Sequence, residues 1–247
     1  MAEGGGDHRT PEAEADEPPT DAALSADHGA DRDRRPVDGE EAEALGHGHE
    51  RGRRRGGLAA AVAVWAATRA VLLLCVFKVF TLPGPDVTSD ISVIYRGWFE
   101  VLRTGTFPFD DVTWQYPPAA ALAVLSPGAL PLDYASAFFV LACATDAVAF
   151  GLLLYGGARP GGRRAGAWAW VAGVPLLGPT AYARYDLMVT AVAVAALLAA
   201  ARHPRAAGAL AAFGAMLKVW PVLLLLGMPR GRWTRRSWVT ALVTVLV

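Results

Sequence analysis

The stretch Thr88–Pro118, TSDISVIYRGWFEVLRTGTFPFDDVTWQYPP, decides the fold because its polar and aromatic residues lie between two strongly apolar regions. Asp90 stands near its start, at the head of a short amphipathic segment, and Tyr116 begins the rigid Tyr-Pro-Pro at its end. The preceding run, Leu58–Phe80, is apolar over about 20 residues, which suits a helix that crosses a bilayer. Residues 81–117 are therefore predicted to form a loop outside the membrane.

The composition divides the chain into two parts. Of its 247 residues 53% are apolar, and the formal net charge is zero. Residues 1–57 are mostly acidic, end in a basic cluster and are predicted to be a disordered tail. The positive-inside rule assigns that cluster, Arg51 and Arg53–Arg55, to the cytoplasm. Residues 58–247 are predicted to be a multi-pass membrane domain, so the expected fold is all-α: a polytopic membrane helical bundle behind a cytoplasmic tail.

Within the loop, apolar residues recur at helical spacing. Ile91, Ile94, Trp98 and Val101–Leu102 fall on one side of a helix that would lie in the membrane interface. Ser89 is expected to cap its start, and Gly105 is expected to follow its end. Asp90 then lies at a helix N-terminus, where the dipole favours a negative charge.

The apolar segments after the loop predict further helices. Residues 118–131 are too short for an ordinary crossing and are predicted to be a re-entrant segment on the outer side. Longer segments, suited to helices, are Ala135–Tyr155, Ala165–Tyr182 and Asp186–Ala201. Basic clusters at 159–164 and 202–205 mark turns on the cytoplasmic side.

The segment Ala206–Met228 is predicted to form two short helices with a break at Lys218–Pro221. A single crossing would place the basic residues after Met228 outside, whereas two short helices return them to the cytoplasm. Broken helices occur where they line a cavity, so Lys218 would point a cation into it. A last apolar run, Ser237–Val247, is too short to cross, and the chain is expected to be truncated at its C-terminus.

Two charged residues fall near the middle of predicted membrane helices. Arg69 lies near the middle of the first helix, where an arginine needs a polar partner or water. Asp146 lies within Ala135–Tyr155 and is either a hydrogen-bonded structural group or a link to Arg69 or to substrate. Cys75 and Cys143 both lie in apolar runs, where free cysteines usually act as small buried hydrophobes.

Taken in order, seven motifs resemble the GT-C superfamily of polyprenyl-phosphate-sugar-dependent glycosyltransferases. They are Arg69, Asp90–Tyr95, Gly105–Phe109, Tyr116–Pro118, Asp146, Arg184–Leu187 and Lys218–Pro221. The resemblance covers about residues 58–247. It is strongest to glycosyltransferase family 87, the bacterial α-mannosyltransferase group, and more distant to the eukaryotic GPI mannosyltransferase I.

The resemblance implies a hexosyltransferase that moves a sugar, expected to be mannose, from a polyprenyl-phosphate donor. The implied acceptor is a lipid-linked or cell-envelope glycan on the extracytoplasmic side, and no cofactor, metal or nucleic acid is implied. In the superfamily the first outer loop carries an essential carboxylate, which corresponds to Asp90 here. Some relatives carry a second acid two residues later, where this chain has Ser92.

Further residues are candidates for substrate binding. A lipid-phosphate leaving group needs nearby positive charge. The candidates are Arg96, Arg184 and Lys218, together with Tyr95, Tyr116 and Asp186. Arg184 and Asp186 could instead simply pair with each other across the start of a helix.

Two other classes of protein remain possible from the sequence. Broken helices, Lys218 and the intramembrane Asp146 would also suit a transporter or flippase of lipid-linked or small solutes. A non-catalytic membrane scaffold derived from a degenerate transferase is the other alternative. Asp110-Asp111 resembles part of a metal site, but a solvated turn after Pro108 is the preferred interpretation, so no metal is predicted.

Overall fold

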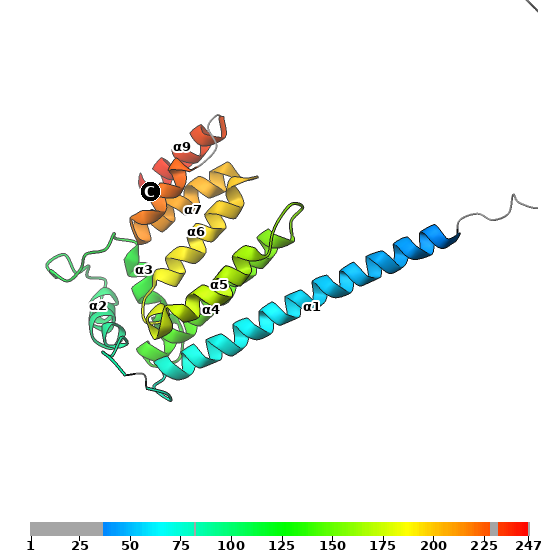
Figure 1. Cartoon of the computed structure of the whole chain (residues 1–247). Coiled ribbons are helices and arrows are strands. Elements are labelled where there is room, and N and C mark those ends of the chain that lie inside the picture. The colour runs from blue at the N-terminus through cyan, green and yellow to red at the C-terminus, as the bar shows by residue number, and fades with distance from the viewer. Residues whose placement is uncertain (1–36, 82, 228–231, 247) are drawn as a thin grey trace, which may run out of the picture. The chain divides into compact units, whose positions relative to one another are not determined.

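The computed structural model describes residues 37–81, 83–227 and 232–246, and these residues contain helices and no strand (Figure 1). The chain divides into two units, residues 1–52 and 53–247, and the candidate site residues all belong to the second unit. The all-helical prediction is confirmed. The apolar composition that suggested membrane helices also fits, because two helices, Arg55–Val76 and Tyr134–Ala158, are long and apolar enough to cross a bilayer.

The helices follow the predicted segments closely after the loop. The α-helices are α1 (Val37–Val76), α2 (Arg96–Leu102), α3 (Ala120–Leu125), α4 (Tyr134–Ala158), α5 (Ala165–Leu176), α6 (Asp186–Ala200), α7 (Pro204–Leu217), α8 (Leu223–Leu226) and α9 (Arg232–Leu246). A π-helix, η1 (Asp90–Tyr95), precedes α2, and short 3₁₀-helices are η2 (Ser126–Ala129), η3 (Gly178–Ala181) and η4 (Trp220–Val222). The predicted crossing over 165–182 is therefore a helix of 12 residues followed by a 3₁₀ turn.

The first helix begins earlier than predicted. Helix α1 starts at Val37, so residues 37–57, which the sequence assigned to the tail, belong to it; residues 1–36 lie outside the described part of the chain. Glu, Ala, Leu and Arg in this stretch are good helix formers, and extending an existing helix avoids the cost of a new nucleus. Composition alone had suggested disorder because the stretch has little apolar surface to bury.

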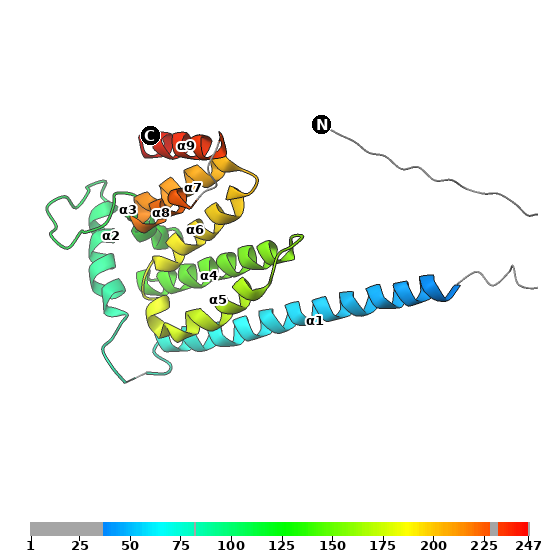
Figure 2. The same ribbon diagram turned by 45° about the horizontal axis from the view of Figure 1, so that its top comes forward.

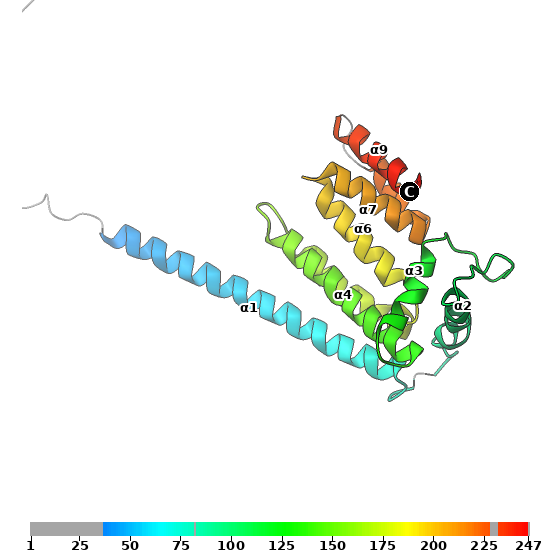
Figure 3. The ribbon, with the colours of Figure 1, turned by 180° about the vertical axis from the view of Figure 1, so that it is seen from behind.

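Helices α4 to α9 pack as an ordered series. Helix α4 contacts α5 and α6, α6 contacts α7, and α7 contacts α9, and both views show these helices side by side (Figures 1 and 2). Helices α2 and α3 lie together at one end of this series (Figure 3). At the α7–α9 contact, Gly208 lies so close to the backbone of Ser237 that no Cβ could fit.

The predicted break after α7 is confirmed. Helix α7 ends at Leu217, and Lys218 takes up an extended backbone with φ −158° and ψ 132°. Pro221, in η4, then prevents the chain from continuing as a regular helix because proline has no N–H to donate. Helix α8 is only four residues long. The break therefore leaves Lys218 outside regular helical structure.

The segment before the Tyr-Pro-Pro is helical, but its buried face differs in part from the prediction. Buried side chains are Ile91, Tyr95, Trp98 and Leu102, whereas Ile94 and Val101 are exposed. The Ser89 hydroxyl donates to the carbonyl of Asp86 at 2.8 Å and does not cap η1. Gly105 follows the helix with a φ of +82°, as expected of a glycine that ends a helix. Tyr95 is the residue that the apolar pattern missed, because its ring packs on Phe138 of α4.

Candidate active site

Asp90 and Arg184 meet across the fold. Asp90 is the first residue of η1, and Arg184 lies in the turn between η3 and α6. Asp90 Oδ2 lies 2.5 Å from Arg184 Nη2, and the Asp90 side chain is 28% exposed. The carboxylate is therefore oriented by a guanidinium and still accessible from outside.

A second ion pair joins Asp186 and Lys218. Asp186 is the first residue of α6, and its Oδ1 lies 2.5 Å from Nζ of Lys218 at the break after α7. The alternative in which Arg184 pairs with Asp186 is wrong, because each side chain has a partner elsewhere. At the start of a helix, side chains two residues apart point in different directions, so the two charged side chains can bind separate partners.

Tyr185 stands between Arg184 and Asp186 in the chain and contacts Lys218 of the second ion pair. Its buried ring lies 5.6 Å from Lys218 Nζ, and its hydroxyl donates to the carbonyl of Leu217 at 3.4 Å. The rings of Tyr116 and Tyr95 lie 5.2 and 6.0 Å from it. The structure thus links six of the seven predicted site residues through two ion pairs and the contacts of Tyr185, which lay inside the predicted Arg184–Leu187 motif but was not among the predicted site residues. Its signal was its place between Arg184 and Asp186.

Burial keeps the hydroxyl of one of these tyrosines, Tyr95, protonated. Desolvation raises the pKa of Tyr95 far above its usual value, with nearby Tyr116 and Tyr185 adding to the effect. The Tyr95 hydroxyl therefore stays protonated and can both donate and accept a hydrogen bond. Tyr116 is half-buried, so its ring borders the outer surface of the site.

Arg96 does not join this group. It is exposed on the first turn of α2, and within the described residues no hydrogen bond or ion pair links it to the other candidates. The neighbouring Trp98 is turned inward and its indole N–H donates to Asp111 Oδ2 at 2.8 Å. Asp111 also accepts from the backbone and hydroxyl of Thr113, and these bonds hold the pKa of its carboxyl below the usual value. Asp111 therefore shapes the loop around Trp98.

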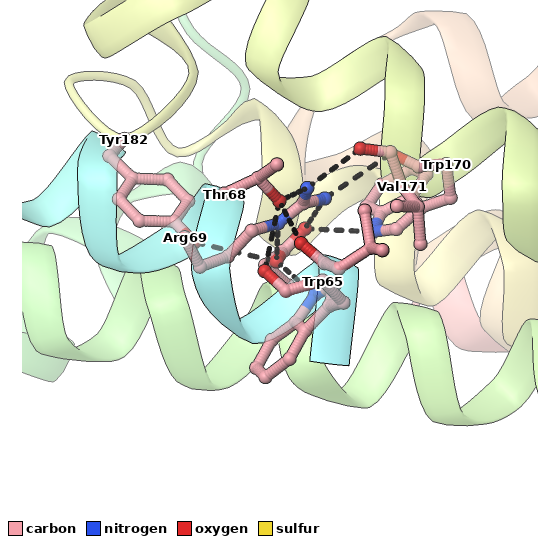
Figure 4. A network of polar contacts seen from close by, with 8 residues as sticks. Trp65, Thr68, Arg69, Trp170, Val171 and Tyr182 are labelled. Atoms are coloured by element: carbon pink, nitrogen blue, oxygen red, sulfur yellow. Dashed lines mark hydrogen bonds and ion pairs between the residues drawn. The ribbon is translucent and has the colours of Figure 1, made fainter. Parts of the chain in front are cut away.

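A second polar group lies deep in the bundle, where Arg69 of α1 meets Asp146 of α4 (Figure 4). Arg69 Nε lies 2.7 Å from Asp146 Oδ2, and Nη2 lies 3.2 Å from Oδ1, so the pair is bidentate. Both side chains are almost completely buried. Of the alternatives left open for Asp146, the link to Arg69 is confirmed.

The same carboxylate accepts three further hydrogen bonds. Indole N–H groups of Trp65 and Trp170 donate to its two oxygens at 2.7 Å each, and the Tyr182 hydroxyl lies 3.4 Å from Oδ2. The remaining N–H groups of Arg69 donate to the Thr68 hydroxyl and to the carbonyls of Trp170 and Val171. We call this set the Asp146 network. Trp65 could have been anticipated, because it lies four residues before Arg69 on the same helix face.

A helical chain with membrane-length helices and a site of paired acidic and basic side chains beside tyrosines is a suitable frame for group transfer at a membrane. The family model of glycosyltransferase family 87 matches residues 114–247, which is more than half of the chain. The chain therefore belongs to glycosyltransferase family 87, and it is a membrane glycosyltransferase. No curated protein and no solved structure matches it.

The family match covers only part of the candidate site. Tyr116, Arg184, Asp186 and Lys218 lie within the matched residues, whereas Asp90, Tyr95 and Arg96 precede them. The connection of Asp90 to the matched part rests on its ion pair with Arg184.

Proposed function

We propose that this chain transfers a hexose, mannose, from a polyprenyl phosphate to a lipid-linked or cell-envelope glycan on the extracytoplasmic side. The observation that carries the proposal is that two ion pairs, Asp90–Arg184 and Asp186–Lys218, join three distant segments at the two residues that flank Tyr185. Such a site offers a base, two cations and aromatic surface at once. Family membership favours this function over the transporter that the broken helix also suggested.

In the proposed reaction Asp90 is the catalytic base. Its carboxylate takes the proton of an acceptor hydroxyl as that oxygen attacks the anomeric carbon of the donor sugar. The bond from the anomeric carbon to the phosphate oxygen breaks, and the electron pair leaves with the lipid phosphate. One displacement assisted by one base inverts the anomeric carbon. Arg184 orients the base through the ion pair that holds Asp90.

Lys218 and Arg184 would stabilise the departing phosphate. An ammonium has three N–H donors, and Asp186 takes one of them, so Lys218 can bind a phosphate oxygen as well. Arg184 likewise has donors beyond the one that faces Asp90. Charge-assisted bonds of this kind act where negative charge develops. Exposed Arg96 would meet the phosphate of an approaching lipid before the donor reaches the site.

The aromatic residues supply a surface for the sugar. Tyr116 is half-buried and its ring stands nearly perpendicular to that of Tyr185, with an interplanar angle of 77°. An aromatic face beside polar groups suits the apolar face of a pyranose. We assign Tyr95 and Tyr116 to substrate binding, with Asp186 keeping Lys218 in position.

The proposed topology is multi-pass with a cytoplasmic N-terminus. The site lies near the start of α4, where Tyr95 packs on Phe138, and the arginines after Ala158 lie beyond the other end of that helix. A helix of 25 residues is about 37 Å long, enough to separate these two ends by a bilayer core. Arginine-rich turns belong on the cytoplasmic side, which leaves the site on the opposite side.

The proposal is tested with membranes that contain the full chain. Radiolabelled polyprenyl-phosphate-mannose is supplied, and the label in the glycan or lipid acceptor fraction is measured, with polyprenyl-phosphate-glucose and a nucleotide-activated mannose as comparison donors. We expect transfer from the mannosyl lipid and none from the nucleotide sugar. Transfer from the glucosyl lipid alone would overturn the sugar assignment, and transfer from the nucleotide sugar alone would overturn the lipid donor.

Replacing Lys218 with Met is expected to raise the KM for the lipid donor. The change removes the cation proposed to bind the phosphate, and a charge-assisted hydrogen bond is worth about 1.5–3 kcal/mol, or roughly 10-fold or more in affinity. Steady-state kinetics at varied donor concentration measure it. Arg103→Met is the matched control, because Arg103 also pairs with an acidic side chain, Glu100 at 2.5 Å, but lies outside the site. Equal KM values in the two variants would remove Lys218 from donor binding.

A further inference from the structure

We propose that Asp146 is a positioning residue that holds together the two chain segments carrying Asp90 and Arg184. The inference rests on the proposed function, in which Asp90 is the base and Arg184 orients it. Asp146 lies in the middle of α4, and its hydrogen-bond partners among the described residues are Trp65, Arg69, Trp170 and Tyr182, so its effect on the Asp90–Arg184 pair passes through these donors.

Donors from three different parts of the chain converge on this one carboxylate. Trp65 and Arg69 come from α1, Trp170 from α5, and Tyr182 directly after η3 (Figure 4). Both carboxylate oxygens are used, and Arg69 in turn donates to two backbone carbonyls of α5. The Asp146 network thus ties α1 and α5 to α4 by directional bonds in an otherwise apolar region.

The first structural connection from Asp146 to the site runs along α1 to Asp90. This helix ends at Val76, and a short connection leads from there to Asp90. An ion pair of 2.8 Å between Lys78 and Asp86 closes the connection, and Thr88 donates to the same carboxylate. Lys78 and Thr88 hold the pKa of Asp86 at about 2, so the carboxylate of this ion pair is charged at neutral pH. The end of α1 therefore sets where η1 begins.

The second connection runs through Tyr182. This residue is buried and stands two positions before Arg184 in a turn whose backbone N–H groups at 182 and 183 both donate to the carbonyl of Pro179. A turn held in this way transmits the position of Tyr182 to Arg184. Both connections end at the Asp90–Arg184 ion pair, so the Asp146 carboxylate positions both members of that pair.

Stability alone does not account for such a network. Replacing a buried ion pair by apolar side chains of similar size is often neutral or stabilising, because desolvation offsets the attraction. What apolar side chains cannot supply is the fixed direction of five hydrogen bonds to one group. The double variant Arg69→Met with Asp146→Leu therefore separates the two roles, since it leaves no unpaired charge and removes the directional bonds.

The test reads the distance between positions 90 and 184 and the rate of transfer. For the distance, Asp90→Cys and Arg184→Cys are combined in a full-length chain whose Cys75 and Cys143 are replaced by Ala, and a short bis-thiosulfonate reagent cross-links them. We expect the cross-linking yield to fall in the Arg69→Met, Asp146→Leu background. With Asp90 and Arg184 restored, we expect kcat to fall about 10- to 100-fold, because a small misplacement of reacting groups has an effect of this size. Donor KM should stay near that of the parent, because Lys218 lies outside the network.

The controls keep the outcome decisive. Arg159→Met removes a guanidinium just after the end of α4 that donates to the Leu198 carbonyl at 3.2 Å, and it should leave both readouts unchanged. If the double variant fails to insert, Tyr182→Phe is compared with Tyr134→Phe, which removes a buried hydroxyl that donates to Val124. A lower cross-linking yield in Tyr182→Phe alone supports the proposal.

Parent-like cross-linking and kcat in the inserted double variant overturn the proposal, as do equal yields in the two tyrosine variants. A parent chain without transfer would count against the proposed function only, because cross-linking then still decides whether Asp146 positions the pair.

Discussion

The Asp90→Asn variant is expected to transfer sugar about 10²- to 10⁴-fold more slowly than the parent chain, which is the usual contribution of a general base. The amide keeps the size of the carboxylate but cannot accept a proton from the acceptor hydroxyl. The effect should appear in kcat, because Lys218 remains to bind the donor phosphate. Single-turnover transfer from polyprenyl-phosphate-mannose at saturating donor measures it.

A matched control lies in the same loop. Asp110 is exposed in the turn after Pro108, and Asp110→Asn removes one carboxylate from the loop without touching Arg184. We expect parent-like transfer from this variant. Equal rates in Asp90→Asn and the parent, with both chains inserted to the same extent, would remove Asp90 from the role of base.

The Asp146→Asn variant is expected to lose about 3–5 kcal/mol of stability, the usual result of removing one partner from a buried ion pair. The side chains of Arg69 and Asp146 are 2% and 0% exposed, so the remaining guanidinium would have no access to water. For a chain of this size the loss corresponds to a fall of roughly 10 °C in the thermal midpoint. Thermal unfolding of detergent-solubilised protein measures the change.

Asp133→Asn serves as the comparison on the same helix. Asp133 caps the start of α4, where its carboxylate accepts from the Ser136 N–H at 3.0 Å, and asparagine caps helices about as well as aspartate. Its midpoint should stay close to that of the parent. If the thermal midpoint of Asp146→Asn equals that of the parent, Arg69 has found another partner. The Asp146 network would then not contribute this free energy to stability.

Local patterns in the sequence were enough to predict several elements. The apolar run of α1 and the length of α4 indicated membrane-length helices, because hydrophobic length is a property of consecutive residues. The break at Lys218 was visible because Pro221 cannot continue a helix. Gly105 marked the end of the amphipathic segment, because glycine readily adopts the positive φ, here +82°, that often ends a helix.

Other features could not be predicted because they depend on which segments meet. The buried face of η1 and α2 includes Tyr95, whose ring finds aromatic partners on α4 and before α6, while Ile94 faces outward. Helical periodicity allows either set of residues to turn inward. Arg96 was grouped with Arg184 on charge alone, yet the fold leaves it on the surface, apart from the other cations.

The sequence by itself determined the helical class, the membrane-length segments, the broken helix and the presence of charged residues that needed partners. Only the tertiary structure decided the partners: Asp90 with Arg184, Asp186 with Lys218, and Arg69 with Asp146. The physical reason is distance. Helix formation depends on residues within a few turns, whereas an ion pair depends on how helices far apart in the sequence pack, and alternating charges around Tyr185 permit more than one pairing until that packing is set.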